Sequence, residues 1–328
     1  MNNVTEWLAN LPPQTVIIVV VVLLGLRFAL LKLPVPAARS AAEVVESLAI
    51  AMGLVFLVIR PFFVQSFYIP SPSMEPTLMG HENSYERVHD HILVNKAVYL
   101  VRDPKPGDIV VFRAPYEALK DTNRFGIVEK QTDYIKRCIA VEGDEIYIEP
   151  GYVLIDSEMY PRSVIQSRIA DILSYENRLN VTRKEDVRVK LVPDGAYVNG
   201  RKVSREKLAE YVVGKRAASV EIHPGYVVRN GVRLKEPYTA EDPDEPYPNL
   251  EDLDRRYALQ KAVAAKKLEL IVDEGHPRVK LGKDQFLMIG DNRNQSHDSR
   301  VWGPVDRNMV VGRSMFVFWP FDRMHWTR

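Results

Sequence analysis

The segment Phe67-Tyr68-Ile69-Pro70-Ser71-Pro72-Ser73-Met74-Glu75-Pro76-Thr77-Leu78 comes directly after the last hydrophobic run of the sequence. A proline fixes its own φ angle, lacks a backbone donor and disfavours helical geometry in the residue before it. We therefore expect Ser71 and Ser73 to lie on a stiff, extended segment and not in a helix. A hydroxyl held in this way is a candidate nucleophile, although serines among prolines more often belong to turns or linkers.

Two hydrophobic runs precede this segment, over about residues 11–33 and 47–64. The first is long enough to span a bilayer. The second is shorter, so it fits a marginal span, a re-entrant segment or a buried helix. We expect a hairpin of two transmembrane helices. A cleavable secretory signal is the alternative, but it needs positive charge before its apolar core, and only the amino terminus supplies it.

The charges around these runs predict their orientation. Three basic residues lie in or near the connection between them: Arg27, Lys32 and Arg39. Residues 1–15 and 65–85 contain no Lys or Arg. Because cytoplasmic connections are enriched in Lys and Arg, we expect the connection in the cytoplasm and everything after residue 64 on the outer face of the membrane.

The composition excludes some classes of protein. The formal net charge of the 328 residues is +1. A net charge this small does not attract nucleic acid, so no nucleic-acid partner is expected. The chain contains one cysteine, Cys138, which rules out an intramolecular disulfide. We interpret Cys138 as a buried structural residue in preference to a thiol nucleophile.

From about residue 85 the sequence favours β structure. Short runs rich in β-branched residues, such as His91–Asn95 and Ile109–Phe112, are separated by turn signals such as Asp103–Asp108. Such a pattern is typical of a β-sandwich or a closed β architecture and not of alternating βαβ units.

Residues 156–276 are more polar and more helical. Leu250–Ile271 matches one amphipathic helix, and Glu236–Pro248, rich in acids and prolines, is expected to be an exposed loop. We interpret residues 156–276 as an α+β insertion lobe between two parts of a β core, residues 65–155 and 277–328. The fold class predicted is mainly β, preceded by a membrane anchor over residues 1–64.

A second segment that could take part in catalysis is Tyr134-Ile135-Lys136-Arg137-Cys138-Ile139-Ala140. Lysine is unusual in an apolar strand. If Lys136 points inward, burial disfavours its ammonium form and provides the neutral amine that a general base needs. The alternative is an edge-strand lysine that faces solvent.

A third segment is polar throughout. Every side chain from Asp291 to Arg300 forms hydrogen bonds or carries charge, and a predicted strand precedes it. Pairs such as Asp298 with Arg300 or Arg293 would make the loop rigid enough to support a neighbouring hydroxyl. The alternative is an ordinary polar loop.

Taken together, these segments resemble type I signal peptidases. The resemblance rests on Ser71-x-Ser73-Met74-Glu75-Pro76-Thr77-Leu78, Tyr134-Ile135-Lys136-Arg137 and Gly290-Asp291-Asn292-Arg293-x-x-Ser296-x-Asp298-Ser299-Arg300, in this order, behind an amino-terminal hairpin. It covers the chain from about residue 11 to its end. Pro72 is a departure, because glycine is common at that position in the family.

The resemblance implies a Ser/Lys dyad in which Ser73 is the nucleophile and Lys136 its general base. The hydroxyl of Ser71 and the backbone N–H of Ser73 would bind the oxyanion, and Ser296 would orient the Lys136 amine. Three residues would support the site: Asp298, Arg300 and Arg137. The implied substrate-binding residues are Phe67, Ile69, Pro70, Met74, Leu78, Asp133, Tyr134 and Ile135.

The resemblance also implies the activity and its setting. The enzyme would remove signal peptides from exported preproteins, cut after small residues, and need no metal or cofactor. It would lie in the bacterial cytoplasmic (inner) membrane with its catalytic domain on the outer, periplasmic face. Its partners would be preprotein signal peptides and membrane lipid, near the secretion translocon.

Four alternatives remain open at this point. The base could be His297 with Asp298 instead of Lys136. Histidines and an acid could bind zinc; these are His81, His89, Asp90 and His91. The chain could be a catalytically silent, membrane-anchored binding or assembly module of the same fold. A self-cleaving Ser/Lys repressor would need a DNA-binding region, where this chain has residues 1–64 instead.

Overall fold

The computed structural model describes residues 12–59, 62–82, 87–122, 132–175, 187–273 and 275–327. The chain forms two compact units. The first comprises Met1–Tyr68, His91–Arg102 and Gly312–Trp326, and the second comprises Ile69–Asp90, Asp103–Val311 and Thr327–Arg328. Predictions for residues 1–11, and for the interruption at Arg60-Pro61, lie outside the described residues.

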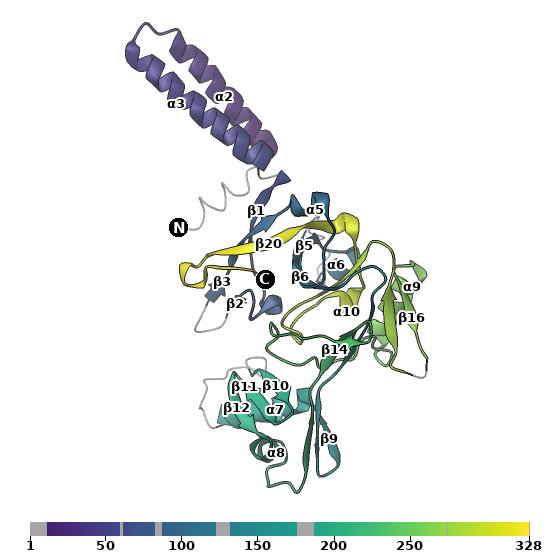
Figure 1. Cartoon of the computed structure of the whole chain (residues 1–328). Helices are drawn as coiled ribbons and strands as arrows, with labels where there is room; N and C mark the ends of the chain where they lie inside the picture. The colour runs from purple at the N-terminus through teal and green to yellow at the C-terminus, as the bar shows by residue number, and fades with distance from the viewer. Residues whose placement is uncertain are drawn as a thin grey trace. The chain divides into compact units, whose positions relative to one another are not determined.

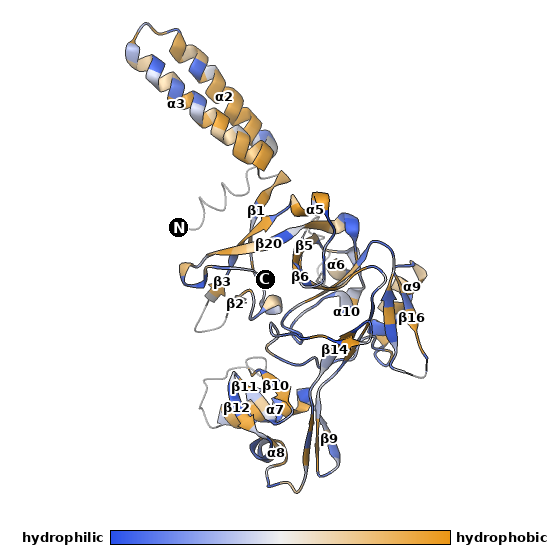
Figure 2. Ribbon diagram, in the orientation of Figure 1, coloured by the Kyte–Doolittle hydropathy of each residue, from blue (hydrophilic) through white to orange (hydrophobic). Residues whose placement is uncertain are grey.

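The first unit begins with two apolar helices that lie side by side (Figure 1). They are α2, Pro13–Leu31, and α3, Pro36–Gly53, which a π-helical segment extends over Leu54–Ile59. Both are long and apolar enough to cross a membrane, and Figure 2 shows that most residues of α2 are hydrophobic. The second helix begins at Pro36 and not near residue 47, because proline suits the first position of a helix.

Small side chains bring the two helices together. Ala38, Ala42 and Ala49 are buried along one side of α3, where small residues allow helix backbones to approach closely. Nε of Arg27 in α2 also pairs with Glu46 of α3 at 2.9 Å.

The rest of the first unit is an antiparallel sheet in the order β1, β4, β20. Its strands are β1 (Val64–Tyr68), β4 (His91–Asn95), β20 (Val310–Trp319) and β21 (His325–Trp326), which pairs with β20. In β4 the buried Ile92 and Val94 alternate with more exposed residues, as expected for a strand with one covered face. The short helix α5 spans Val98–Val101.

In the second unit, four strands neighbour one another in the order β5, β6, β18, β19. They are β5 (Ile109–Arg113), β6 (Asp133–Ala140), β18 (Gln285–Ile289) and β19 (Val305–Asp306). All pairs are antiparallel. Strand β6 therefore lies between two others, and this position excludes the edge-strand alternative for Lys136.

A second sheet of this unit has the order β15, β14, β7, β17, β16. The strands are β15 (Val232–Arg233), β14 (Tyr226–Arg229), β7 (Glu145–Glu149), β17 (Arg278–Leu281) and β16 (Leu268–Ile271). Helix α9, Leu253–Ala264, shares their hydrophobic core. The predicted helix over 250–271 is thus shorter, because Lys266 has a left-handed φ of 55° and Leu268–Ile271 pairs with β17 instead.

A separate hydrophobic core is built from side chains within residues 153–222. It joins the sheet of β8 (Tyr152–Ile155), β9 (Glu158–Pro161) and β13 (Val220–His223) to that of β10 (Val189–Val192), β11 (Gly195–Val198) and β12 (Arg201–Ser204). Helices α7 (Arg162–Tyr175) and α8 (Arg205–Val213) complete it (Figure 1). The predicted lobe of residues 156–276 contributes to both cores of the second unit, and the division of the chain into domains stays a prediction.

Several short elements connect these sheets: η2 (Pro72–Met74), β2 (Gly80–Glu82), β3 (Arg87–His89), α6 (Tyr116–Thr122), α10 (Ser299–Trp302), η4 (Arg307–Met309) and η5 (Phe321–Arg323). The prediction of a mainly β chain with two apolar amino-terminal helices is confirmed.

The acidic segment Glu236–Pro248 is not the exposed loop that its composition predicts, because a buried cation binds it. Arg162 of α7 is fully buried and donates to Glu241 at 3.0 Å and, through Nη2, to Asp244 at 2.5 Å. Asp242 is also buried and accepts a 2.7 Å hydrogen bond from the backbone N–H of Leu191. Burial raises the pKa of Asp242 to about 7.

Candidate active site

The candidate nucleophile lies just after β1. Ser71 is extended, with φ −132° and ψ 153°, as predicted. Ser73, however, sits within the single 3₁₀ turn Pro72–Met74, closed by a 3.0 Å hydrogen bond from Glu75 N to Pro72 O. Proline at the first position of this turn is already restricted to a suitable φ, which explains why the segment does not stay extended.

The hydroxyl of Ser73 contacts the amine of Lys136. Their Oγ and Nζ atoms are 2.8 Å apart, although the residues are 63 positions apart in the sequence. Ser71 Oγ lies 3.2 Å from Ser73 Oγ. The Lys136 amine also donates to the carbonyl of Ile135 at 2.9 Å. Ser73 is only 7% exposed and Lys136 5%, so the pair is largely shielded from water.

Burial shifts the protonation of Lys136. Its pKa falls from 10.5 to about 8, mainly because the interior penalises the charged ammonium. The carboxylates of Asp298 and Asp291 oppose this change, and the charge of Arg300 adds to it. A neutral lysine amine is therefore accessible near neutral pH, as a general base requires.

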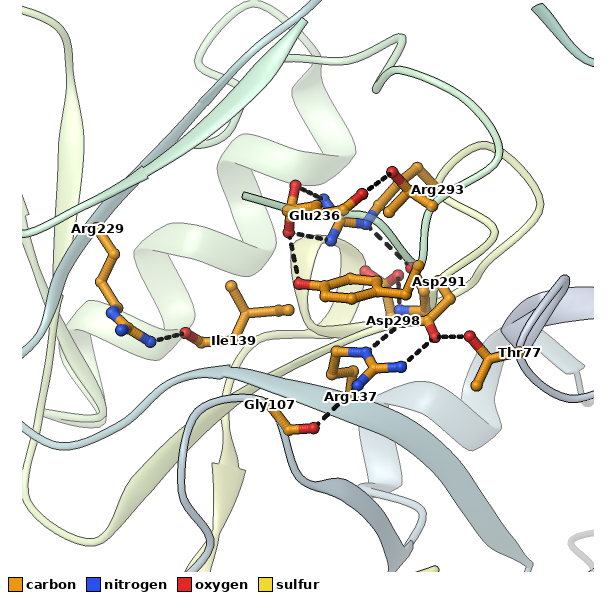
Figure 3. Close-up of polar contacts among 12 residues, drawn as sticks. Thr77, Gly107, Arg137, Ile139, Arg229, Glu236, Asp291, Arg293 and Asp298 are labelled. Carbon is orange, nitrogen blue, oxygen red and sulfur yellow. Dashed lines mark hydrogen bonds and ion pairs between the residues drawn. The ribbon is translucent and has the colours of Figure 1, made fainter. Parts of the chain in front are cut away.

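A buried ion pair joins the strand of Lys136 to the segment of Ser73 (Figure 3). Arg137 donates to both oxygens of Asp291, at 2.8 and 2.6 Å. Thr77 donates to the same carboxylate at 2.5 Å. Because Arg137 follows Lys136 directly and Thr77 lies four residues after Ser73, Asp291 ties the two halves of the candidate dyad to one loop.

A second carboxylate organises the same loop. Asp298 accepts hydrogen bonds from the backbone N–H of Gly290 at 3.0 Å and from Nε and Nη2 of Arg300, both at 2.8 Å. Burial alone would raise the pKa of Asp298, but the charge and hydrogen bonds of Arg300 lower it overall. Of the two arginines considered from the sequence, Asp298 thus pairs with Arg300.

Ser296 lies beside the dyad without the hydrogen bond predicted for it. Its Oγ is buried and has no partner of acceptable geometry among the described residues, although it lies near enough to Asp298 to help lower the pKa of that carboxyl. A Cβ added to Gly290 would overlap both this hydroxyl and the carbonyl oxygen of Ser73. Orientation of Lys136 by Ser296 stays a prediction.

The predicted substrate-binding residues differ in their accessibility. Met74 and Leu78 are completely buried and Ile69 is 2% exposed, so they pack inside the second unit. Pro70 and Asp133 are exposed, whereas Tyr134 and Ile135 are partly buried. Phe67 lies in β1 of the first unit, partly buried.

The two rival sites gain no support from the geometry. The exposed His297 is not among the hydrogen-bond partners of the Ser73 hydroxyl, which within the described residues are Lys136 and Ser71. No group of three or more possible metal ligands occurs in the part of the chain that the structure describes. There His89 Nδ1 contacts the carbonyl of Ile69 at 2.9 Å, and Asp90 accepts from Met79 N at 2.8 Å; the side chain of His81 lies outside that part.

Two residues around the site, Asn292 and Glu236, were given no role from the sequence. Asn292 donates from Nδ2 to the carbonyl of Pro72 at 3.1 Å and from its backbone N–H to that of Ser73 at 3.2 Å. Glu236 pairs with Arg293 at 2.5 Å. The signals for Asn292 were its place in the polar loop and in the third motif of the family resemblance. Nothing in the sequence links Glu236 to that loop.

Known proteins match the chain over most of its length. Residues 41–204 and 203–319 match the family described as "Signal peptidase, peptidase S26". The probable signal peptidase I-2 of a Synechocystis strain is 27% identical over 266 residues, which cover 81% of this chain and 68% of that protein. Signal peptidase I of Aquifex aeolicus is 27% identical over 279 residues, with 84% and 83% covered. A crystal structure of a signal peptidase I from Enterococcus faecalis covers 65% of this chain and 97% of its own, at 14% identity and a TM-score of 0.22.

Proposed function

We propose, because this chain belongs to the signal peptidase family, peptidase S26, that it is a serine endopeptidase that removes signal peptides from preproteins through a Ser73/Lys136 dyad. The observation that carries the dyad is the 2.8 Å contact between Ser73 Oγ and Lys136 Nζ in a buried setting that lowers the pKa of the lysine to about 8. A silent binding module would have no need of this combination.

In the proposed reaction, the neutral amine of Lys136 takes the proton of Ser73 as its Oγ attacks the scissile carbonyl. The ammonium then protonates the leaving amine, and a covalent ester between Ser73 and the signal peptide remains. Lys136, neutral again, activates the water that hydrolyses this ester. Burial favours each return to the neutral amine, because the site penalises the ammonium form.

The oxyanion would be bound by the Ser73 backbone N–H and the Ser71 hydroxyl. This assignment is supported by the position of Ser71 Oγ, 3.2 Å from the nucleophile. Pro72 removes one backbone donor between the two serines, where glycine would supply it, but the two groups assigned to the oxyanion do not depend on that donor. Removing one such donor typically costs about 100- to 1000-fold in kcat.

The substrate would bind extended beside the exposed start of β6, where Asp133 and Tyr134 offer backbone and side-chain contacts. Cleavage after a small residue such as Ala is the expected specificity. The apolar helices α2 and α3 would anchor the chain as two spans with their connection in the cytoplasm. The catalytic residues would then lie on the outer face of the bacterial cytoplasmic membrane. The protein would contact lipid and would lie near the translocon.

The test is a cleavage assay with the full chain in detergent and a preprotein whose signal ends in Ala-x-Ala. Intact protein should cut after the final Ala, and both Ser73→Ala and Lys136→Ala should be inactive. Lys280→Ala, which removes an exposed lysine from β17, should cut as the intact protein does. Continued cutting by Lys136→Ala would place the base elsewhere. No cutting by intact protein beside an active reference peptidase would favour the silent module.

A further inference from the structure

Two buried arginines of the candidate site, Arg137 and Arg293, contact a pair of residues outside the catalytic motifs, Tyr238 and Glu236, which we call the brace. Figure 3 labels Glu236 and the two arginines. Glu236 binds the guanidinium of Arg293 through both carboxylate oxygens, at 2.5 and 3.1 Å. The ring of Tyr238 lies over the guanidinium of Arg137, 3.9 Å from ring centroid to Cζ. The tyrosine hydroxyl donates to Glu236 at 2.9 Å, which connects the two halves of the brace.

Each arginine leads to one half of the dyad. Arg137 follows Lys136 in β6 and binds Asp291, which also accepts from Thr77 on the segment of Ser73. Arg293 donates from Nε to the carbonyl of Gly290 at 3.1 Å. The Cα of Gly290 faces the carbonyl oxygen of Ser73 so closely that no Cβ fits between them.

Because the side chains of Arg137 and Arg293 are buried, losing a partner should be costly for either of them. Arg137 is 1% exposed and Arg293 2%. A buried guanidinium that loses its partner moves toward water or another acceptor, because an isolated charge in the interior is costly. Either movement would pull on the strand of Lys136 or on the loop behind Ser73.

We propose that Glu236 and Tyr238 are positioning residues for the Ser73/Lys136 dyad, and that they act through Arg293 and Arg137. Neither touches the reacting atoms. The proposal rests on the proposed function, since it assigns these residues to the same dyad. It also explains why a segment outside the three catalytic motifs is held against them.

The chain offers a matched control for the brace. Tyr160 donates to Glu158 at 2.7 Å across the same two-residue spacing, but this hydrogen bond is exposed and lies in β9, while the Tyr160 ring is partly buried against the separate core of residues 153–222. Tyr160→Phe therefore removes a tyrosine–glutamate hydrogen bond of the same kind that includes neither Glu236, the partner of Arg293, nor the ring over Arg137. It should leave kcat, KM and the pH profile unchanged.

The informative variant is Tyr238→Leu, because it removes the ring from Arg137 without changing a charge below about pH 10. We expect kcat to fall about tenfold or more, as for a displacement of less than 1 Å, with KM within about twofold. Tyr238→Phe keeps the ring and should recover most of kcat. Glu236→Gln should also lower kcat, since it leaves the charge of Arg293 without its carboxylate.

The pH profile separates positioning from simple packing. Six groups surround or influence the Lys136 amine: Ser73, the Tyr134 ring, the Ile135 carbonyl, Asp298, Asp291 and Arg300. If Tyr238→Leu loosens this environment, water reaches the amine and the pKa of Lys136 rises toward its ordinary value. The midpoint of the acid limb of kcat/KM should then move to higher pH by at least about half a unit.

The same shift can be measured without any substrate. Trace acetylation of all lysines at a series of pH values, read by mass spectrometry, reports the pKa of Lys136 in folded intact protein and in Tyr238→Leu. A raised pKa in the variant supports the brace even if intact protein fails to cut the preprotein, which would count against the proposed function alone. An unchanged pKa and kcat, with only a lower melting temperature, would overturn the proposal.

Discussion

Replacing Gly290 by alanine should damage catalysis more than it damages folding. The new methyl carbon would overlap the carbonyl oxygen of Ser73 and lie 2.6 Å from Cβ of Ser296, whereas carbon atoms normally pack about 3.5–4.0 Å apart. The neighbours must therefore move by about 1 Å. Because one of them is the backbone of Ser73, rotation of a side chain cannot relieve the overlap. A displacement of this size at a reacting group costs on the order of 100-fold in rate, about 2.7 kcal/mol.

The assay is kcat and KM for preprotein cleavage by purified Gly290→Ala in detergent, expressed per folded molecule from circular dichroism. Gly282→Ala is the steric control, because its added Cβ would lie 2.6 Å from the backbone carbonyl oxygen of Lys266, just before β16 begins and just after β17 ends. Both variants should lose about 1–3 kcal/mol of stability from overpacking, but only Gly290→Ala should lose activity per folded molecule. Equal kcat in the two variants would refute the assignment of Ser73 as the displaced group.

Three further predictions concern charge. The kcat/KM of the intact enzyme should rise through about pH 8 as Lys136 loses its proton, and a profile flat from pH 6 to 9 would contradict the lysine base. At pH 7 about one tenth of such an amine is neutral, against fewer than about one in a thousand at a pKa of 10.5. Asp242→Asn should raise the melting temperature more at pH 8 than at pH 5. The folded chain holds the Asp242 proton up to about pH 7, but the unfolded chain releases it near pH 4, so stability falls between these values by up to about 4 kcal/mol; an equal gain at both pH values would count against this account. Arg162→Met leaves Glu241 and Asp244 without their buried cation and should cost about 3–5 kcal/mol in urea unfolding, so a loss below about 1 kcal/mol would show that the segment is held by other contacts.

The two partners of the candidate dyad could be predicted, but their contact could not be derived from local pattern. A lysine within an apolar strand and a serine held between prolines are each unusual enough to single out. The two residues are 63 positions apart, and no local pattern reports a contact over such a separation. The pairing of Ser73 with Lys136 was predicted only from the resemblance of three motifs, in one order, to a known family. The geometry adds the 2.8 Å distance and the burial that lowers the pKa of Lys136.

Long-range pairing of charges was harder to predict. Glu236–Pro248 has the composition of an exposed loop. Composition alone, however, does not reveal a distant residue that binds the segment and buries it. Here Arg162, far away in the sequence, binds the acids, and burial follows from that pairing. The helix predicted over 250–271 ended early for a related reason, since β17 offered Leu268–Ile271 backbone partners that the helical pattern could not reveal.

The charges near Lys136 explain how a buried lysine can keep a lowered pKa of about 8 beside two carboxylates. Asp291 and Asp298 both favour the ammonium form, and unpaired they would hold the proton on the amine. Each, however, is bound through both oxygens by its own arginine, Asp291 by Arg137 and Asp298 by Arg300. In each ion pair the positive charge of the arginine offsets the negative charge of the carboxylate. The net electrostatic potential at the Lys136 amine is therefore smaller than the potential of either carboxylate alone. Burial prevails as a result, and the same ion pairs that make the loop rigid also leave the amine free to accept a proton.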